Sequence, residues 1–197
     1  MANRTLYLIR HGQYDSALKV RDGGGLTDVG KQQAEYAARA MQNIPLTAIV
    51  ASTMLRAIET ATIIAEAANM QYTVTPLLRE AIPSIPPRIA THILDLMARD
   101  PHLTHESIHE DQKRADEAFT QFFIPPPQDK DANDALICHG NILRYLTCKA
   151  LGVNADTWAK MNINHCGITV FMIDENGLIR LHSHNETRHL PMELITD

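Results

Sequence analysis

The sequence predicts an α/β fold in which helices cover both faces of a mostly parallel central sheet, a three-layer α/β/α sandwich. Short apolar or β-branched runs alternate along the chain with stretches whose apolar residues recur at helical spacing. Of the 197 residues, 45% are hydrophobic and 21% are charged, which is close to the composition of soluble globular proteins. We therefore expect one domain over residues 1–197.

The first strand-loop-helix unit begins at the amino terminus. Residues 5–9 form an apolar run that is typical of a buried strand, and this strand ends abruptly at Arg10 and His11. A glycine-rich loop follows at residues 22–25. Thr27 can then cap a helix in which alanines and a methionine recur at helical spacing.

A second unit follows with the same arrangement. Residues 47–51 are a short strand, and residues 55–68 are an alanine- and isoleucine-rich helix that carries Arg56 in its first turn. A third, weaker strand at residues 72–74 leads to Glu80.

The middle of the chain predicts an insertion into the domain. Prolines forbid regular structure over residues 81–87, and a helix over residues 89–99 is followed by a polar turn that extends to Gln112. A further helix spans residues 116–123 and ends at a run of prolines.

The carboxy-terminal third contains one more unit and a hairpin. Residues 135–138 are a fourth strand, which ends at His139 and leads into a helix over residues 142–151. Residues 168–173 and 178–182 flank an Asn-Gly turn, which indicates a terminal β-hairpin.

Charge and composition exclude several classes of protein. The formal net charge of -5 argues against a protein that coats nucleic acid or an anionic membrane. No apolar run approaches the roughly 18 residues of a membrane span, and the amino terminus has no signal-peptide pattern, so we expect a cytoplasmic protein. The cysteines are 3 in number and lack a metal-binding spacing, and we expect Cys138 to point into the core.

Charged and imidazole side chains follow the predicted strands at the points where the strands end. In chain order they are Arg10, His11, Arg56, Glu80 and His139. Ligands of open parallel sheets bind outside the carboxyl ends of the strands. We therefore expect these side chains to converge on one site.

This set of residue types suits the chemistry of a phosphomonoester. Paired guanidinium groups can hold phosphoryl oxygens, and an imidazole between them can attack phosphorus and carry the group as a phosphohistidine. Glu80 could protonate the leaving alkoxide and then activate water, provided that burial raises its pKa. A protonated His139 would stabilise charge on the phosphoryl oxygens. Gly12 and Gly140 would let the ligand approach the backbone, and the scheme needs no metal and no cofactor.

The motifs that carry these residues resemble those of the histidine phosphatase superfamily, also called phosphoglycerate-mutase-like. The similar motifs extend over essentially the whole chain and are Leu8-Ile9-Arg10-His11-Gly12, Leu26-Thr27 through Gly30 with Gln33-Ala34, Ala51-Ser52 through Arg56-Ala57 with Thr60-Ala61, Leu78-Arg79-Glu80, and Cys138-His139-Gly140-Asn141. The resemblance implies a phosphoglycerate mutase-like fold, His11 as the phosphorylated nucleophile and Glu80 as the proton donor. It also implies a phosphate pocket of Arg10, Arg56 and His139, and it suggests a homodimer.

Within the superfamily the chain is most similar to the mitochondrial serine/threonine protein phosphatase branch, which favours a phosphorylated protein as the substrate. That branch carries an amino-terminal membrane anchor and an assembly segment, which we do not expect here because the chain starts at its first strand. The branch often has serine at the position of Gly12. Gln13-Tyr14-Asp15 replaces the Glu-Ser or Glu-Thr pair that mutases carry, and this argues against a mutase.

Several other polar residues have two interpretations each. Gln13 and Asn141 could contact phosphate, although capping and turn roles explain them equally well. Arg79, Arg88 and Arg144 could recognise a phosphorylated peptide, or they could pair on the surface.

Histidines away from these motifs are also ambiguous. His102, His105 and His109 have carboxylates nearby and could bind zinc, because positions 105 and 109 lie one helical turn apart. A solvated polar helix is the alternative interpretation. The carboxy-terminal histidines could be exposed or could touch substrate; they are His165, His182, His184 and His189.

Three other functions stay open. A small-metabolite phosphatase or phosphoglycerate mutase would have the same site and would prefer a compact sugar phosphate or phosphoglycerate. A non-catalytic module that binds phosphorylated partners would need only the cations, whereas both histidines and an acid are present. A metal-dependent hydrolase would use His11, His139 and Glu80 as ligands, and EDTA would inhibit it.

Overall fold

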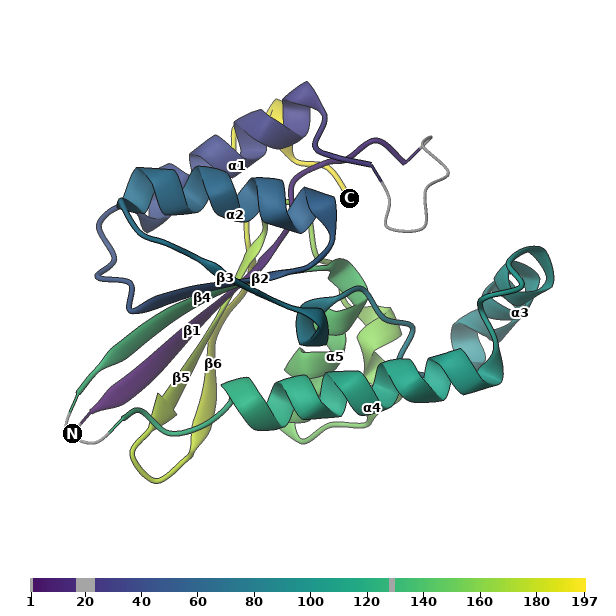
Figure 1. Cartoon of the computed structure of the whole chain (residues 1–197). Helices are drawn as coiled ribbons and strands as arrows, with labels where there is room; N and C mark the ends of the chain where they lie inside the picture. Colours follow the sequence, from purple (N-terminus) through teal and green to yellow (C-terminus); the bar gives the residue numbers. More distant parts are fainter. Residues whose placement is uncertain (1, 17–23, 128–129) are drawn as a thin grey trace.

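A six-stranded sheet forms the centre of the molecule (Figure 1), in a computed structural model that describes residues 2–16, 24–127 and 130–197. The strand order is β3-β2-β4-β1-β5-β6. The strands are β1 (Asn3–Arg10), β2 (Ala48–Ser52), β3 (Thr73–Thr75), β4 (Ala132–Cys138), β5 (Ile168–Asp174) and β6 (Ile179–Glu186). Among these strands, β5 alone runs in the direction opposite to the others, so the predicted mostly parallel sheet is confirmed.

Helices cover both faces of this sheet (Figure 1). On one face lie α1 (Asp28–Met41) and α2 (Leu55–Ala68). On the other face lie α4 (His105–Phe122) and α5 (Gly140–Leu151), and α3 (Ala90–Arg99) adjoins the amino-terminal end of α4. The three-layer α/β/α sandwich predicted from the sequence is therefore confirmed.

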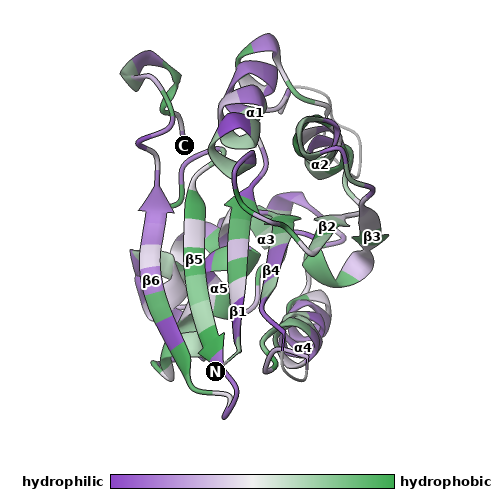
Figure 2. Ribbon diagram, turned by 90° about the vertical axis from the view of Figure 1, so that its left-hand side faces the viewer, coloured by the Kyte–Doolittle hydropathy of each residue, from purple (hydrophilic) through white to green (hydrophobic). Residues whose placement is uncertain are grey.

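Each face of the sheet has its own apolar core. Ile9 is buried among the alanines of α1 and α2, whereas Leu6 and Leu8 are buried against α4 and α5. One strand supplies both cores because successive side chains of a strand point to opposite faces. Figure 2 shows that the middle of β1 and most of β5 are apolar, as expected for strands with two covered faces.

The loop after β1 packs directly on the first turn of α1. As predicted, Thr27 caps this helix, and its hydroxyl accepts a hydrogen bond from the N–H of Gly30 at 3.0 Å. A Cβ atom at Gly12 would lie 2.4 Å from the carbonyl oxygen of Gly30. A Cβ atom at Gly30 would lie 1.9 Å from the carbonyl oxygen of Gln13. Only glycine fits at these two positions, so the contact fixes the loop that follows His11.

The predicted start of α4 is wrong. The sequence predicts a polar turn up to Gln112, whereas the helix begins at His105. A capping box starts it: the Thr104 hydroxyl accepts from the N–H of Ser107 at 3.1 Å, and the Ser107 hydroxyl accepts from the N–H of Thr104 at 2.8 Å. Few side chains of α4 are buried, so its apolar periodicity is too weak to reveal the first turns.

The other predicted elements are present with small shifts of their ends. Residues 22 and 23 of the predicted glycine-rich loop lie outside the described part of the chain. Cys138 is fully buried, which confirms its predicted place in the core, and burial raises the pKa of its thiol. Among the described residues, no helix is long and apolar enough to cross a membrane.

Candidate active site

The carboxyl ends of β1, β2 and β4 meet at one edge of the sheet, and the predicted site residues gather there. In the parallel register of β1 and β4, Arg10 lies opposite Cys138. The next residue of each strand is a histidine, so His11 and His139 lie side by side with their ring centres 4.9 Å apart. Both imidazoles are buried, with 2% and 0% exposure.

His11 is held in a single tautomer. Its Nδ1 lies 2.7 Å from the carbonyl oxygen of Gly12, which can only accept, so Nδ1 carries the proton. Nε2 accepts a hydrogen bond from Nε of Arg56 at 2.9 Å. Burial, and then the proximity of His139, Arg56 and Arg10, lower the pKa of His11 well below its ordinary value. The ring is therefore neutral, with its lone pair on Nε2, and this is the form that a nucleophile needs.

His139 is the second buried imidazole of the site. Its Nε2 lies 2.8 Å from the hydroxyl oxygen of Ser52, the last residue of β2. Burial, and then the charges of Arg56 and Arg79, lower the pKa of His139 well below its ordinary value. In the free protein this ring is therefore neutral. Its Nδ1 is buried and has no hydrogen-bond partner among the described residues.

Two arginines flank the imidazoles. Arg10 donates to the carbonyl oxygen of Ile163, and its Nε is buried without a hydrogen-bond partner in the described part of the chain. Arg56 is only 5% exposed, and its guanidinium carbon lies 4.4 Å from the ring centre of Tyr14. Buried polar atoms almost always have a partner in proteins, so an unpaired one indicates a place for water or a ligand. Arg10 Nε and His139 Nδ1 are such atoms: the first is suited to an anion, and the second is suited to one when it carries the ring proton.

Glu80 lies half-buried beside the amino-terminal end of α5. Its Oε1 accepts from the backbone N–H groups of Ala81 (3.0 Å), Asn141 (3.1 Å) and Ile142 (3.3 Å). Burial raises the pKa of Glu80, and these N–H groups together with the nearby arginines oppose the rise without cancelling it. A raised pKa favours the protonated form of the carboxyl group, which is the form that acts as a general acid.

These groups give the site a recognisable chemistry, because imidazoles, guanidinium groups and a protonated carboxyl are the parts of a metal-free phosphoryl-transfer site. The family model described as the histidine phosphatase superfamily, branch 1, matches residues 6–187. The chain belongs to the histidine phosphatase superfamily. It is a phosphatase, as the resemblance of its motifs implies.

Named relatives of this histidine phosphatase are protein phosphatases. The mitochondrial serine/threonine-protein phosphatase Pgam5 of Drosophila grimshawi is 33% identical over 208 residues, which cover 98% of this chain and 67% of the relative. The mitochondrial PGAM5 of Mus musculus is 31% identical over 205 residues, which cover 99% of this chain and 67% of the relative. The predicted cytoplasmic location is contradicted by these relatives, because both are named mitochondrial proteins.

A solved structure shares the fold. The phosphoglycerate mutase of Plasmodium falciparum is 25% identical and superimposes with a TM-score of 0.66, over 98% of this chain and 96% of that one. The phosphoglycerate mutase-like fold that the resemblance implies is therefore confirmed.

Three further predicted residues of the phosphatase adjoin the site, and they are Gln13, Asn141 and Gly140. The side-chain oxygen of Gln13 accepts from the Thr27 hydroxyl at 2.8 Å, and that of Asn141 accepts from Arg144. Both side-chain oxygens therefore make local contacts within the protein, which agree with the capping and turn roles considered for these residues. Gly140 opens α5, and a Cβ there would lie 3.5 Å from Nε of Arg10, so the helix start packs on this guanidinium group.

His165 belongs to the active-site cluster of the phosphatase, although the sequence does not single it out. Its ring centre is 5.6 Å from that of His11, and its Nε2 accepts from Arg10 at 3.1 Å. Burial, and then the charge of Arg10, lower the pKa of His165 to about 3, so the ring is neutral. One signal could have found it. His165 lies just before β5, and because β5 is antiparallel to β1, its first residues lie at the edge where the parallel strands end.

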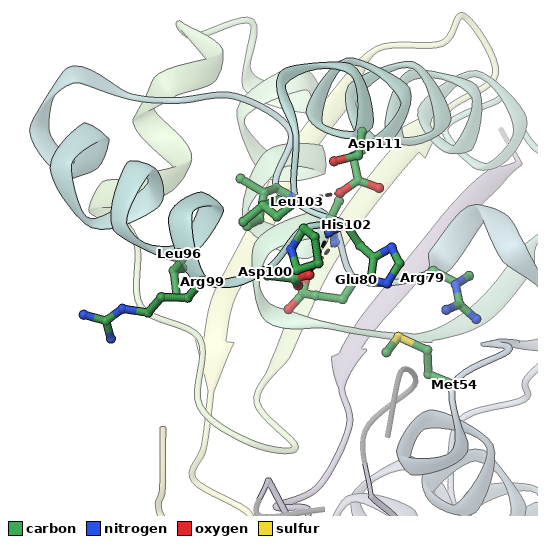
Figure 3. A pocket seen from close by; sticks show the side chains of 13 residues that line it. Met54, Arg79, Glu80, Leu96, Arg99, Asp100, His102, Leu103 and Asp111 are labelled. Carbon is green, nitrogen blue, oxygen red and sulfur yellow. Dashed lines mark hydrogen bonds between the residues drawn. The ribbon is translucent and has the colours of Figure 1, made fainter. Parts of the chain in front are cut away.

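A groove of about 930 Å³ opens beside Glu80 in the phosphatase (Figure 3). We call it the Glu80 groove. Among the residues that line it are Met54, Arg79, Glu80, Ile82, Leu96, Arg99, His102, Leu103 and Asp111. Arg79 also donates to the hydroxyl of Thr53 at 3.1 Å. Arg144, in contrast, is used inside the protein, where it donates to the carbonyl oxygens of Gly140 and Met161.

The histidines of the insertion lie outside the cluster of buried imidazoles, although His102 lines the Glu80 groove. His102, His105 and His109 are exposed. Across residues 2–16, 24–127 and 130–197, no group of three or more histidine, cysteine, aspartate or glutamate side chains could hold a metal ion.

Proposed function

We propose that this phosphatase hydrolyses phosphoserine or phosphothreonine in proteins through a phosphohistidine at His11. The observation that carries the proposal is the buried cluster at the sheet edge, where two imidazoles with ring centres 4.9 Å apart meet two guanidinium groups and a carboxyl of raised pKa. The substrate class is supported by the relatives, which are named serine/threonine-protein phosphatases.

The first step transfers the phosphoryl group to the protein. Arg10 and Arg56 hold the phosphoryl oxygens, and Nε2 of His11 attacks phosphorus as the bond to the substrate oxygen breaks. Nε of Arg56 donates to this same Nε2 in the free protein, so Arg56 turns from the imidazole to a phosphoryl oxygen when substrate binds. Glu80 gives its proton to the leaving serine or threonine oxygen.

The second step regenerates the enzyme. The Glu80 carboxylate takes a proton from water, and the water oxygen attacks phosphorus as the bond to Nε2 breaks. Inorganic phosphate leaves, and His11 returns to its neutral form. Nδ1 of His139 can donate to a phosphoryl oxygen in both steps when its proton lies there, with Nε2 accepting from Ser52. Neither step needs a metal ion or a cofactor.

The Glu80 groove supports a large leaving group. Glu80, the proposed acid, is one of the residues that line its volume of about 930 Å³. The lining combines apolar side chains such as Met54 and Leu103 with the cation of Arg79. A peptide on both sides of a phosphoserine could use this space, whereas a compact phosphoglycerate would leave most of it to water.

Hydrolysis in excess EDTA tests the proposal. We expect the wild-type chain to hydrolyse a phosphothreonine peptide and 4-nitrophenyl phosphate, and to prefer the peptide over 3-phosphoglycerate. His11→Ala should lose both activities, whereas His109→Ala, which changes an exposed histidine, should keep them. Rapid quenching with radiolabelled substrate should give an acid-labile phosphoprotein in the wild type and none in His11→Ala.

Each rival function predicts another result. Activity that EDTA abolishes would indicate a metal-dependent hydrolase. A preference for 3-phosphoglycerate would indicate a metabolite phosphatase or mutase. Full activity of His11→Ala, or binding of the peptide without turnover, would contradict the phosphohistidine route.

A further inference from the structure

A charged pair on α4 holds the backbone on both sides of Glu80. Arg114 donates to the carbonyl oxygens of Arg79 at 2.8 Å and Glu80 at 2.9 Å. Asp111 is ion-paired with Arg114 and accepts from the N–H of Ile82 at 2.8 Å. The contacts therefore lie before, at and after the proposed acid.

This segment depends on side chains for its position. Residues 81–86 have no regular secondary structure, and their prolines cannot donate hydrogen bonds. Arg114 and Asp111 reach it from a helix that lies 29 to 35 positions further along the chain. Their side chains are only 20% and 27% exposed, so these hydrogen bonds are largely shielded from water.

The carboxyl end of the Glu80 side chain is held by the other helix of this face. Its Oε1 accepts from the first N–H groups of α5, at Asn141 and Ile142. The two helices are joined to each other, because the Tyr145 hydroxyl of α5 donates to Asp116 of α4 at 2.8 Å. One helix thus fixes the backbone of Glu80, and the other fixes its carboxyl group.

We propose that Arg114 and Asp111 are positioning residues that aim the Glu80 carboxyl at the leaving oxygen of the substrate. The inference rests on the general-acid role of Glu80 proposed above. A general acid must lie within hydrogen-bond reach of the oxygen that it protonates, and a misplacement of about 1 Å can cost about 10²-fold in rate.

The test compares two substrates that differ in their need for an acid. The serine alkoxide released from a phosphoserine peptide needs a proton, whereas the nitrophenolate of 4-nitrophenyl phosphate can leave without one. The quantity to measure is kcat/KM, because it includes the steps up to release of the leaving group and excludes hydrolysis of the phosphohistidine. We expect Arg114→Met to lower kcat/KM for the peptide about 10²-fold and to leave that for the aryl phosphate nearly unchanged.

Two matched variants control for charge and folding. Lys113→Met removes an exposed cation from the adjacent position of α4 and should change neither activity. Arg114→Lys keeps the charge but cannot reach both carbonyl oxygens, so we expect a smaller loss with the same dependence on the leaving group. This milder variant carries the test if Arg114→Met does not fold, as judged by its thermal unfolding.

Glu80→Gln separates this inference from the proposed function. It should show the same selective loss, and adding Arg114→Met to it should cause little further loss because both act on one proton transfer. An equal loss on both substrates in the Arg114 variants, with Glu80→Gln still selective, would overturn the inference alone. An equal loss in Glu80→Gln itself would remove the general acid and the inference with it.

Discussion

Burial sets the protonation of His11 and Glu80 in opposite directions. It disfavours the charged form of any group, so it removes the proton from an imidazole and keeps the proton on a carboxyl. It is the largest cause of the pKa shift at both residues. The raised pKa of Glu80 and the lowered pKa of His11 therefore let a protonated acid and a neutral nucleophile coexist at a pH where the free groups would both be charged.

The pH dependence of kcat/KM follows from these directions. Because the pKa of Glu80 is raised, its acid form persists above the pH at which free glutamic acid ionises, and activity falls as pH rises through the raised pKa. Because the pKa of His11 is lowered, its protonation should produce no acid limb near its ordinary value of about 6.5. A pH-rate profile, corrected for the second ionisation of the phosphate at about 6, measures both effects.

Glu80→Gln is the matched variant for this profile. It should remove the alkaline limb that the phosphoserine peptide shows, and lower the rate with that substrate throughout. An acid limb near about pH 6.5 that persists after the phosphate correction would contradict the low pKa of His11.

At the scale of elements, the contact between the loop after β1 and the start of α1 fixes the nucleophile. Gly12 and Gly30 let two backbones approach more closely than a Cβ atom would allow. The N–H of Gly12 also donates to the hydroxyl of Thr60 in α2 at 3.1 Å. The nucleophile loop is thus held by both helices of one face, and its rigidity depends on the absence of two side chains.

Gly30→Ala should destabilise the protein strongly. Its Cβ would lie 1.9 Å from the carbonyl oxygen of Gln13, so the loop or the helix has to move, at a cost of about 3 kcal/mol. Gly152→Ala is the control: φ is +64° there and nothing lies within 4 Å, so only backbone strain of about 1 kcal/mol is expected. Unfolding in denaturant measures the loss of folding stability in each variant. Equal losses in the two variants would show that the close contact carries no special cost.

The short helix α3 leaves apolar side chains uncovered beside the Glu80 groove. Leu94 is 49% exposed and Leu96 is 37% exposed, and of the two Leu96 lines the groove. A peptide substrate that passes along the groove would bury part of Leu96. Ile93 of the same helix is buried in the core, so we expect only the exposed face of α3 to contact the substrate.

Leu96→Asp should weaken the hydrolysis of peptides selectively. For a phosphothreonine peptide with apolar flanking residues, we expect kcat/KM to fall about tenfold, equal to about 1.4 kcal/mol. Hydrolysis of 4-nitrophenyl phosphate should stay unchanged, because this substrate has no flanking residues. Leu94→Asp on the same helix should leave both rates as they are. A similar loss in both variants would indicate damage to α3 and not a lost contact in the groove.

Across the whole molecule, the sequence predicts those features whose signals are local. Residues 6–9 are apolar or aromatic without interruption because both faces of β1 are covered, and His11 and His139 stand out because each directly follows a strand. His165 and Arg114 do not stand out. The contact of His165 with Arg10 joins residues 155 positions apart, and no local pattern reports such a contact.

The last residues of the chain complete a polar network beside the active site. The Thr196 hydroxyl accepts from Gln33 and lies 2.9 Å from Nδ1 of His165. Gln33 in turn accepts from the N–H of Gln13 at 2.8 Å, and His165 accepts from Arg10 at 3.1 Å. Thr196 therefore links the loop that follows the nucleophile to a proposed phosphate ligand, although it lies next to the carboxyl terminus.

Thr196→Val tests whether this network sets the position of Arg10. Because Nε2 of His165 accepts from Arg10, its Nδ1 carries the proton, and valine would remove the hydroxyl that accepts from this N–H, at a cost of about 1–3 kcal/mol. We expect a lower unfolding temperature and, as Arg10 loosens, inhibition by inorganic phosphate that is weaker by about tenfold. Thr196→Ser should restore both, and Thr187→Val, which lies outside the network, should alter neither. A loss of stability with unchanged phosphate inhibition would mean that the network only anchors the tail, and that Ile163 alone suffices to orient Arg10.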